Sequence, residues 1–212
     1  LNEHGFAKTG SFEPVATSRP GVSVCGLFEC PKDIPETMVQ ASAAAFRAST
    51  SLRAVRAVAD EAEIFPPERD VSAEEPRIGV FVCDCGFDIG GVVDVAAIVG
   101  NAGPLPGVVV ADCIGHGCSR ESLERIQQAI RDHRLNRVVL GACSPRTHET
   151  LFQDTVRRAG LNKYLVEIAN IRDQDTWVHR DRPAEAAHKA DELMRMAVAA
   201  VRYAHPLTDH TL

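Results

Sequence analysis

The chain has 212 residues, of which 45% are hydrophobic and 25% charged, and its formal net charge is −6. This composition is typical of soluble globular proteins, and the acidic balance argues against a nucleic-acid partner, which usually meets a basic face. No apolar run approaches the ~18 residues of a membrane span and no signal peptide opens the chain, so we expect a cytoplasmic protein without membrane insertion. A start at Leu1 rather than Met suggests a piece of a longer protein.

Seven cysteines are present, and their spacing is unlike that of small secreted disulfide scaffolds. In a chain of this size, metal ligation or redox chemistry is a better interpretation of them than a set of disulfides. Cys25 and Cys30 flank the end of a strand-like run, where we favour packing over a redox pair.

Residues 1–62 form the first of two unequal parts, and residues 63–76, rich in proline and charge, are interpreted as a linker. The first part is expected to contain two short strands and an alanine-rich helix, at residues 12–16, 22–26 and 36 to about 60. Asp33 is placed to cap this helix, and Pro35 suits its first turn.

From residue 77 onward, strand-like and helix-like segments alternate. The predicted strands are residues 78–83, 108–111, 138–142 and 164–168. The predicted helices are residues 93–102, 119–133, 147–159 and 183–204. This alternation implies βαβ units, so we predict an α/β fold with a Rossmann-like parallel sheet and flanking helices over residues 77–207.

Four cysteines are predicted to meet at one edge of this sheet. Cys83 and Cys85 lie at the end of the first strand, Cys118 lies past the second strand at a helix start, and Cys143 ends the third strand. Ligands of open α/β sheets bind beyond the carboxyl ends of the strands. Four thiolates gathered there would make a soft site that suits an iron–sulfur cluster or zinc.

The loops around these cysteines add support, because helix starts offer free N–H groups and a partial positive charge to thiolates. The expected helix caps are Ser119, Ser144 and Thr147. The glycines expected to admit close backbone approach are Gly86, Gly115, Gly117 and Gly141.

Other assignments of these residues stay open. By spacing alone Cys113 could replace Cys85 or Cys118 as a ligand, and His116 could ligate zinc. The four cysteines could also be small buried residues at strand ends, where free cysteine is common.

The second part closely resembles the amino-terminal domain of HdrA, a component of heterodisulfide reductase. Matching stretches include Arg77-Ile-Gly-Val-Phe-Val-Cys-Asp-Cys-Gly86, Ala142-Cys-Ser-Pro-Arg-Thr-His-Glu149, Ala169-Asn-Ile-Arg172 and Trp177-Val-His179. The resemblance implies a [4Fe–4S] cluster that exchanges electrons with a following flavin domain. It assigns the ligand role to Cys83, Cys85, Cys118 and Cys143. Many relatives have cysteine where this chain has Asp175, and Cys113 is not a position that the family is expected to keep.

The first part resembles the closing segment of the same family's thioredoxin-reductase-like FAD domain. Arg19-Pro-Gly-Val-Ser-Val-Cys-Gly26 and Pro31-Lys-Asp-Ile-Pro-Glu-Thr37 carry this resemblance. It implies FAD contacts, only in the full-length parent, at Ile34, Pro35, Glu36 and Thr37. The Gly-x-Gly-x-x-Gly turn is absent, so we expect no stable flavin binding by this chain alone. The order implies a junction between two HdrA-like units, with a second flavin domain expected beyond Leu212.

These features favour an electron-transfer module of a heterodisulfide-reductase-like iron–sulfur flavoprotein, relaying electrons between FAD and partner iron–sulfur subunits. The expected partners are other heterodisulfide-reductase-like or hydrogenase-type electron-transfer subunits and FAD domains of the same polypeptide. The piece alone is not expected to be catalytic. The main alternative is a zinc-bound or metal-free subunit-docking domain without redox activity.

A third hypothesis, a thiol–disulfide catalyst, would pair Cys83 with Cys85, whose single-residue separation disfavours a strain-free disulfide. The polar residues of the recognisable motifs are interpreted mainly as loop-stabilising, with a role in lining the site as the alternative. They are Arg146, His148, Glu149, Asn170, Arg172, Trp177 and His179.

Overall fold

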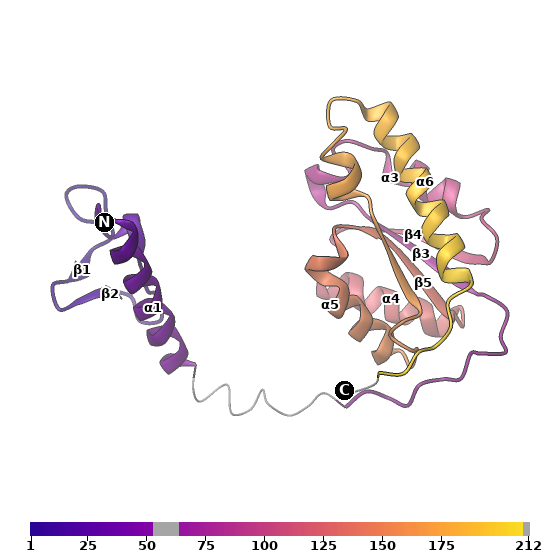
Figure 1. Ribbon diagram of the computed structural model, residues 1–212, viewed down its shortest axis with the longest axis horizontal. Helices are drawn as coiled ribbons and strands as arrows, with labels where there is room; N and C mark the ends of the chain where they lie inside the picture. Colours follow the sequence, from indigo (N-terminus) through magenta and orange to yellow (C-terminus); the bar gives the residue numbers. More distant parts are fainter. Residues whose placement is uncertain (53–63, 210–212) are drawn as a thin grey trace. The chain divides into compact units, whose positions relative to one another are not determined.

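The computed structural model describes residues 1–52 and 64–209 (Figure 1). The chain divides into two compact units, Leu1–Glu63 (unit 1) and Ile64–Leu212 (unit 2), and each is described by itself. Among the described residues, no helix is both long and apolar enough to cross a membrane.

Unit 1 is a small antiparallel hairpin with one helix beside it. Its elements are β1 (Thr9–Gly10), β2 (Glu13–Thr17), the 3-10 turn η1 (Gly26–Phe28) and α1 (Ile34–Ser51). The strand predicted at residues 22–26 is wrong, because only Ser23 pairs, in a single bridge with Ala16. Gly26, with φ of 71°, instead turns the chain into η1.

The start of α1 was predicted correctly from its capping residues. The Asp33 side chain accepts the Glu36 N–H at 2.8 Å, and the Glu36 carboxylate accepts the Asp33 N–H at 3.3 Å. This capping box, with Pro35 in the first turn, places the helix start at Ile34, two residues before the expected position. The rest of the predicted helix, from residue 53 to about residue 60, lies outside the described residues.

The described residues of unit 1 form almost no core of their own. No residue of α1 is buried, and the apolar side chains of Ile34, Met38, Val39 and Phe46 are all largely exposed. Among the described residues of unit 1, the buried apolar ones are Ala7, Ala16 and Val24. The large apolar side chains of α1 are therefore left mostly uncovered by the described residues of this unit.

Unit 2 is an α/β unit built on a four-stranded sheet in the order β4-β3-β5-β6, in which every neighbouring pair is parallel. The strands are β3 (Ile78–Cys83), β4 (Val108–Ile114), β5 (Arg137–Ala142) and β6 (Val166–Asn170). The longer helices are α3 (Val95–Ala102), α4 (Arg120–Asp132), α5 (Pro145–Arg158) and α6 (Pro183–Arg202). The predicted fold class is confirmed.

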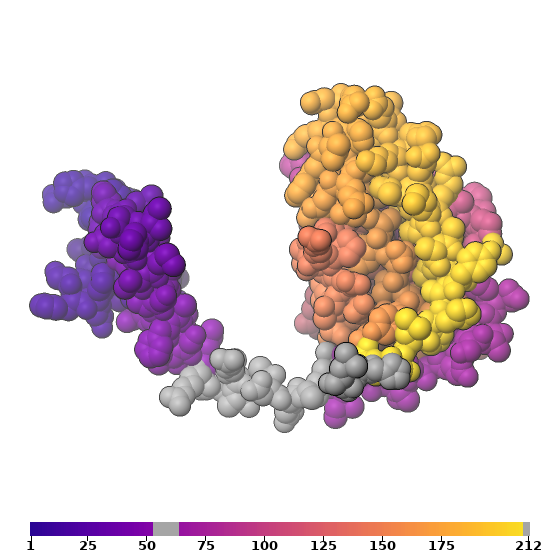
Figure 2. Space-filling view, viewed as in Figure 1, coloured from indigo at the N-terminus to yellow at the C-terminus, as the bar shows by residue number. Residues whose placement is uncertain are grey.

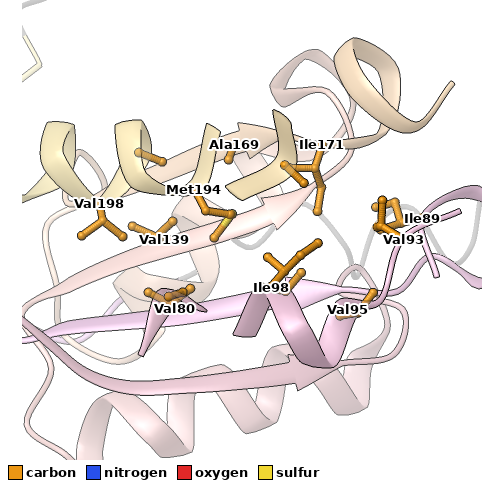
Figure 3. Packing of buried hydrophobic residues seen from close by; sticks show 14 of the residues in the cluster. Val80, Ile89, Val93, Val95, Ile98, Val139, Ala169, Ile171, Met194 and Val198 are labelled. Atoms are coloured by element: carbon orange, nitrogen blue, oxygen red, sulfur yellow. The ribbon is translucent and has the colours of Figure 1, made fainter. Parts of the chain in front are cut away.

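The helices cover both faces of this sheet (Figure 1). α3 and α6 share one apolar core with the sheet, in which Val80 and Val139 of the central strands meet Met194 and Val198 of α6 (Figure 3). α4 and α5 share a second core on the other face. In the space-filling view, α6 (yellow) forms a continuous surface with the segment that contains β6 (Figure 2). β3 and β5 are buried along their whole length, as parallel strands between two helical layers are expected to be.

Several boundaries differ from the predicted ones, and three of them have local reasons that the structure shows. β4 runs three residues further than predicted, because Asp112, Cys113 and Ile114 continue to pair with β3. β6 begins two residues later than predicted, because Asn162 holds a turn by accepting the Tyr164 N–H on its side chain and the Leu165 N–H on its carbonyl.

The third difference concerns α5, which begins at Pro145 with Ser144 in the capping position. Thr147, predicted as a cap, therefore lies inside the first turn, where its N–H donates to the Ser144 carbonyl at 3.0 Å. Ser144 itself makes no side-chain capping hydrogen bond.

Candidate metal centre

The four predicted ligands lie where three neighbouring strands end. Cys83 is the last residue of β3 and Cys85 follows two residues later, while Cys143 comes directly after β5. Cys118 precedes Ser119, the residue that caps α4 by accepting the Ser122 N–H. Because β3 pairs with both β4 and β5, the loops that carry these cysteines are adjacent at the carboxyl edge of the sheet.

The thiols affect one another's pKa. Besides burial, negative charge on Cys85 or Cys118 raises the pKa of the Cys143 thiol, and negative charge on Cys85 raises the pKa of Cys83. Burial raises the pKa of Cys83 to about 11, although N–H groups of Gly117 and Cys85 work in the opposite direction. Burial also raises the pKa of Cys143. The two buried thiols are thus protonated at neutral pH, and a metal that bound them would displace their protons.

Cys83 has the most enclosed sulfur environment of the four. The Gly117 N–H donates to its Sγ at 3.2 Å, and the thiol donates to the Gly115 carbonyl at 3.2 Å. A Cβ on Gly117 would lie 3.2 Å from Ile114 Cδ1 and 3.6 Å from Cys83 Sγ. Glycine therefore lets the Gly117 N–H approach Cys83 Sγ without crowding Ile114.

The other glycines have different roles. Gly86 has a φ of 58°, which suits the turn after Cys85, and a Cβ on Gly115 would meet nothing within 4 Å. Gly141 does not serve the cysteine edge as predicted: its missing Cβ makes room for Met194 of α6, whose Sδ would lie 2.7 Å away.

Cys85 adopts an uncommon backbone conformation. Its φ of 45° and ψ of 33° place it in the left-handed region, which non-glycine residues rarely occupy. The turn is held by the Asp84 carboxylate, which accepts the Gly86 N–H at 3.0 Å, and by the Cys85 carbonyl, which accepts the Asp88 N–H at 3.2 Å. Strained residues of this kind cluster at functional sites.

A short π-helical turn, η3 (Arg172–Thr176), follows β6 and contributes polar groups to the cysteine loops. Arg172 Nη1 lies 3.7 Å from Cys85 Sγ, and the Asp173 carboxylate accepts the Ser144 N–H at 3.0 Å. The contribution of Asp173 was missed by the sequence reasoning. An acidic residue directly after the Ala-Asn-Ile-Arg motif was the available signal, but nothing local indicated a π-turn.

One of the remaining candidates lies near the cysteine loops, since His116 Nε2 would be 3.9 Å from a Cβ on Gly86. Cys113 pairs with Val82 inside the sheet and packs against the core on the α3 and α6 side, and His116 is exposed. In unit 1, Cys25 is exposed, and Cys30 donates to the Glu29 carboxylate at 2.9 Å. All seven cysteines are free thiols.

The residues proposed from resemblance to contact FAD lie in the first turn of α1. Ile34, Pro35 and Glu36 are exposed there, and the Thr37 hydroxyl donates to the Asp33 carbonyl at 2.8 Å. Their part in flavin binding stays a prediction.

Within residues 1–52 and 64–209, no group of three or more His, Cys, Asp or Glu side chains is arranged to hold a metal ion. The four cysteines lie at one edge of the sheet, but their sulfurs are not arranged around a single metal position. Their chemistry nevertheless fits an iron–sulfur cluster, because the four soft donors lie on adjacent loops, with the Gly117 N–H at Cys83 Sγ and the Arg172 cation near Cys85 Sγ.

No family model matches the chain. Curated relatives match well. The HdrA component of the H(2):CoB-CoM heterodisulfide,ferredoxin reductase of Methanothermobacter thermautotrophicus is 51% identical over 140 residues, 66% of this chain and 21% of that protein. An iron-sulfur HdrA component of the CoB--CoM heterodisulfide reductase of Methanopyrus kandleri is 52% identical over 132 residues, 62% of this chain and 20% of that protein. Over about two thirds of its length, the chain is therefore similar to HdrA components of heterodisulfide reductases.

The chain spans about a fifth of the length of these relatives. A heterodisulfide reductase HdrA-like protein of Archaeoglobus profundus matches at 45% identity over 139 residues. Each of these alignments is more than twice as long as unit 1, which ends at Glu63, so most of the aligned residues lie in unit 2. The similarity therefore concerns mainly the unit that carries the cysteine edge.

Proposed function

We propose that unit 2 is an electron-transfer module of a heterodisulfide-reductase-like iron–sulfur flavoprotein. Cys83, Cys85, Cys118 and Cys143 would hold a [4Fe–4S] cluster, which supplies one-electron redox chemistry when bound. The observation that carries the proposal is the placement of these four cysteines on three adjacent loops at the carboxyl edge of a parallel sheet. Relatives named as iron-sulfur subunits of heterodisulfide reductases support it.

The chain's own residues would prepare this edge in two ways. The Gly117 N–H already points at Cys83 Sγ, and such donors stabilise a sulfur that has lost its proton. α4 and α5 begin two residues after Cys118 and Cys143 respectively, so their N-terminal dipoles favour negative charge on both sulfurs.

Unit 1 would be the closing segment of a thioredoxin-reductase-like FAD domain, over residues 1–62. Its exposed apolar helix supports this proposal, because such a surface is expected of a segment taken from a larger core. In the full-length parent, Ile34, Pro35, Glu36 and Thr37 would contact FAD. The electron partners would be FAD domains of the same polypeptide and other heterodisulfide-reductase-like or hydrogenase-type subunits, in the cytoplasm.

Anaerobic reconstitution with iron and sulfide tests the cluster. The full chain should take up about four irons and four sulfides, as expected of a Cys₄-bound [4Fe–4S] cluster, and should gain broad absorption near ~400 nm. Cys143→Ala should lose most of this iron. Cys25→Ala, which removes an exposed cysteine of unit 1, should keep it.

The competing function is a subunit-docking domain without redox activity. Two observations favour it: the Cys83 thiol already has a carbonyl partner, and the described side chains form no closed metal site. A folded protein that takes up no iron would support the metal-free form of this alternative. Colourless binding of one zinc through the same cysteines would support the zinc-bound form.

A further inference from the structure

The π-turn η3 touches the two loops that carry Cys85 and Cys143. Arg172 reaches Cys85 Sγ at 3.7 Å, in the loop after β3. The Thr176 hydroxyl donates at 2.5 Å to the carbonyl of Asp88, in the same loop. Asp173 accepts the N–H of Ser144, next to Cys143, in the loop after β5. One turn of five residues therefore fastens the two loops together, and π-turns are frequent at functional sites.

The guanidinium of Arg172 is held firmly in this turn. Its carbon lies 4.7 Å from the centroid of the Trp177 ring, and its Nε lies 3.5 Å from Asp173 Oδ2. Its side chain is only 18% exposed, so water screens its charge weakly. The positive charge acts on Cys143 as well as on Cys85.

We propose that η3 is the positioning element of the metal centre and that Arg172 is the residue in it that sets the charge of the site. The inference rests on the proposed cluster function. Arg172 holds Cys85 toward the Cys143 loop, and its cation favours the reduced cluster, which carries one more negative charge, over the oxidised one. Asp173 fixes the Cys143 loop and places a negative charge beside the same site.

Arg172 and Asp173 carry opposite charges. Neutralising one or the other should therefore shift the reduction potential of the cluster in opposite directions. The full chain is reconstituted anaerobically, and the potential is measured by titration with a chemical reductant under spectroscopic control. Arg172→Gln should make the potential more negative, and Arg172→Lys should return it toward the wild-type value. Asp173→Asn should make it less negative, while its amide oxygen still accepts the Ser144 N–H.

A second readout tests the fastening of the loops. Asp173→Ala removes the acceptor for Ser144, so iron should be lost to a chelator several times faster than from Asp173→Asn. The matched control is Arg202→Gln, which removes an arginine stacked on Tyr203 at the end of α6. This control should leave both the potential and the chelation rate unchanged.

Two results would overturn the inference while the proposed function stands. One is a loaded wild type whose potential is unchanged in both Arg172→Gln and Asp173→Asn, and the other is a shift that Arg172→Lys does not reverse. A wild type that takes up no iron would instead overturn the proposed function, and this inference with it. If Arg172→Gln fails to fold, the Asp173 pair alone decides, because its expected shift has the opposite sign.

Discussion

The carboxyl of Asp175 is buried in η3. The residue is 0% exposed, and neither of its carboxylate oxygens has a hydrogen-bond partner among the described residues. Burial raises its pKa to about 6, against the opposing influence of Lys189 and His179. Lys189 directs its ammonium group elsewhere, to the Gln174 carbonyl at 2.5 Å. The structure thus tolerates this carboxyl best when it is protonated.

Asp175 should therefore make the free energy of unfolding depend on pH. Its pKa is about 6 in the folded chain and near 3.8 when unfolded, so the folded state binds the proton more tightly. Stability is then lost as pH rises between these two values, by at most about 3 kcal/mol. Asp175→Asn should be more stable than the wild type above pH ~6, and the difference should vanish near pH ~4.

Urea unfolding of both proteins across this pH range measures the effect. Asp181→Asn, at an exposed position after η3, is the control and should follow the wild type. A stability difference between Asp175→Asn and the wild type that stays constant from acid to neutral pH would contradict the explanation.

At the scale of single residues, the sequence predicts those contacts that join residues close to one another along the chain. The caps at Asp33 and Ser119 were predicted correctly, because a capping side chain bonds an N–H two or three residues away. The contacts of Arg172 with Cys85 and of Asp173 with Ser144 join distant segments. They follow from the packing of η3, which no local pattern encodes.

Between elements, β5 and α6 pack closely at Gly141. A Cβ there would lie 2.7 Å from Met194 Sδ and 3.3 Å from Ile171 Cδ1, inside the core shown in Figure 3. Gly141→Ala should therefore destabilise unit 2 by about 1–3 kcal/mol, because Met194 must leave its packed rotamer. Denaturant unfolding measures the loss.

Gly115→Ala is a matched control for this substitution. Its Cβ would meet nothing within 4 Å and its φ is not positive, so its stability should stay within about 0.5 kcal/mol of the wild type. If the two variants were equally stable, α6 could shift without an energetic cost. The close approach at Gly141 would then not be needed for stability.

Element types were easier to predict than element ends. The buried strands β3 and β5 were recognised from continuous runs of apolar residues. The predicted strand at β4 ended too early, because Asp112 and Cys113 follow the apolar run, although their backbone continues to pair with β3. The run at residues 22–26 has the composition of a strand but only one bridging residue, since Gly26 turns the chain away.

At the scale of the whole chain, the two units differ in how they can be stable. Unit 2 has two cores, one on each face of its sheet, whereas unit 1 buries few apolar residues among those described. We expect residues 64–212, expressed alone, to unfold cooperatively at the same urea midpoint as the far-ultraviolet transition of the full chain. Residues 1–63 alone should show no cooperative transition.

Circular dichroism during urea titration of both pieces is the measurement. A sharp transition in residues 1–63 would contradict the view that the few apolar residues buried in the described part of unit 1 are too few to stabilise it. A lower midpoint for residues 64–212 alone would show that unit 1 stabilises unit 2.

The strand order has one more consequence, which concerns the unfolded chain. β3 and β5 are neighbours in the sheet, yet β4, two α-helices and a short 3-10 turn lie between them in the sequence. A metal core bound to Cys83 and Cys143 would therefore be a cross-link as well as a redox centre. If it survived denaturation, it would close a loop of roughly 60 residues and limit the freedom of the unfolded chain as a disulfide does, worth about 4 kcal/mol in the chain-entropy description. Oxidative loss of the metal cluster would then remove this cross-link together with the proposed electron carrier.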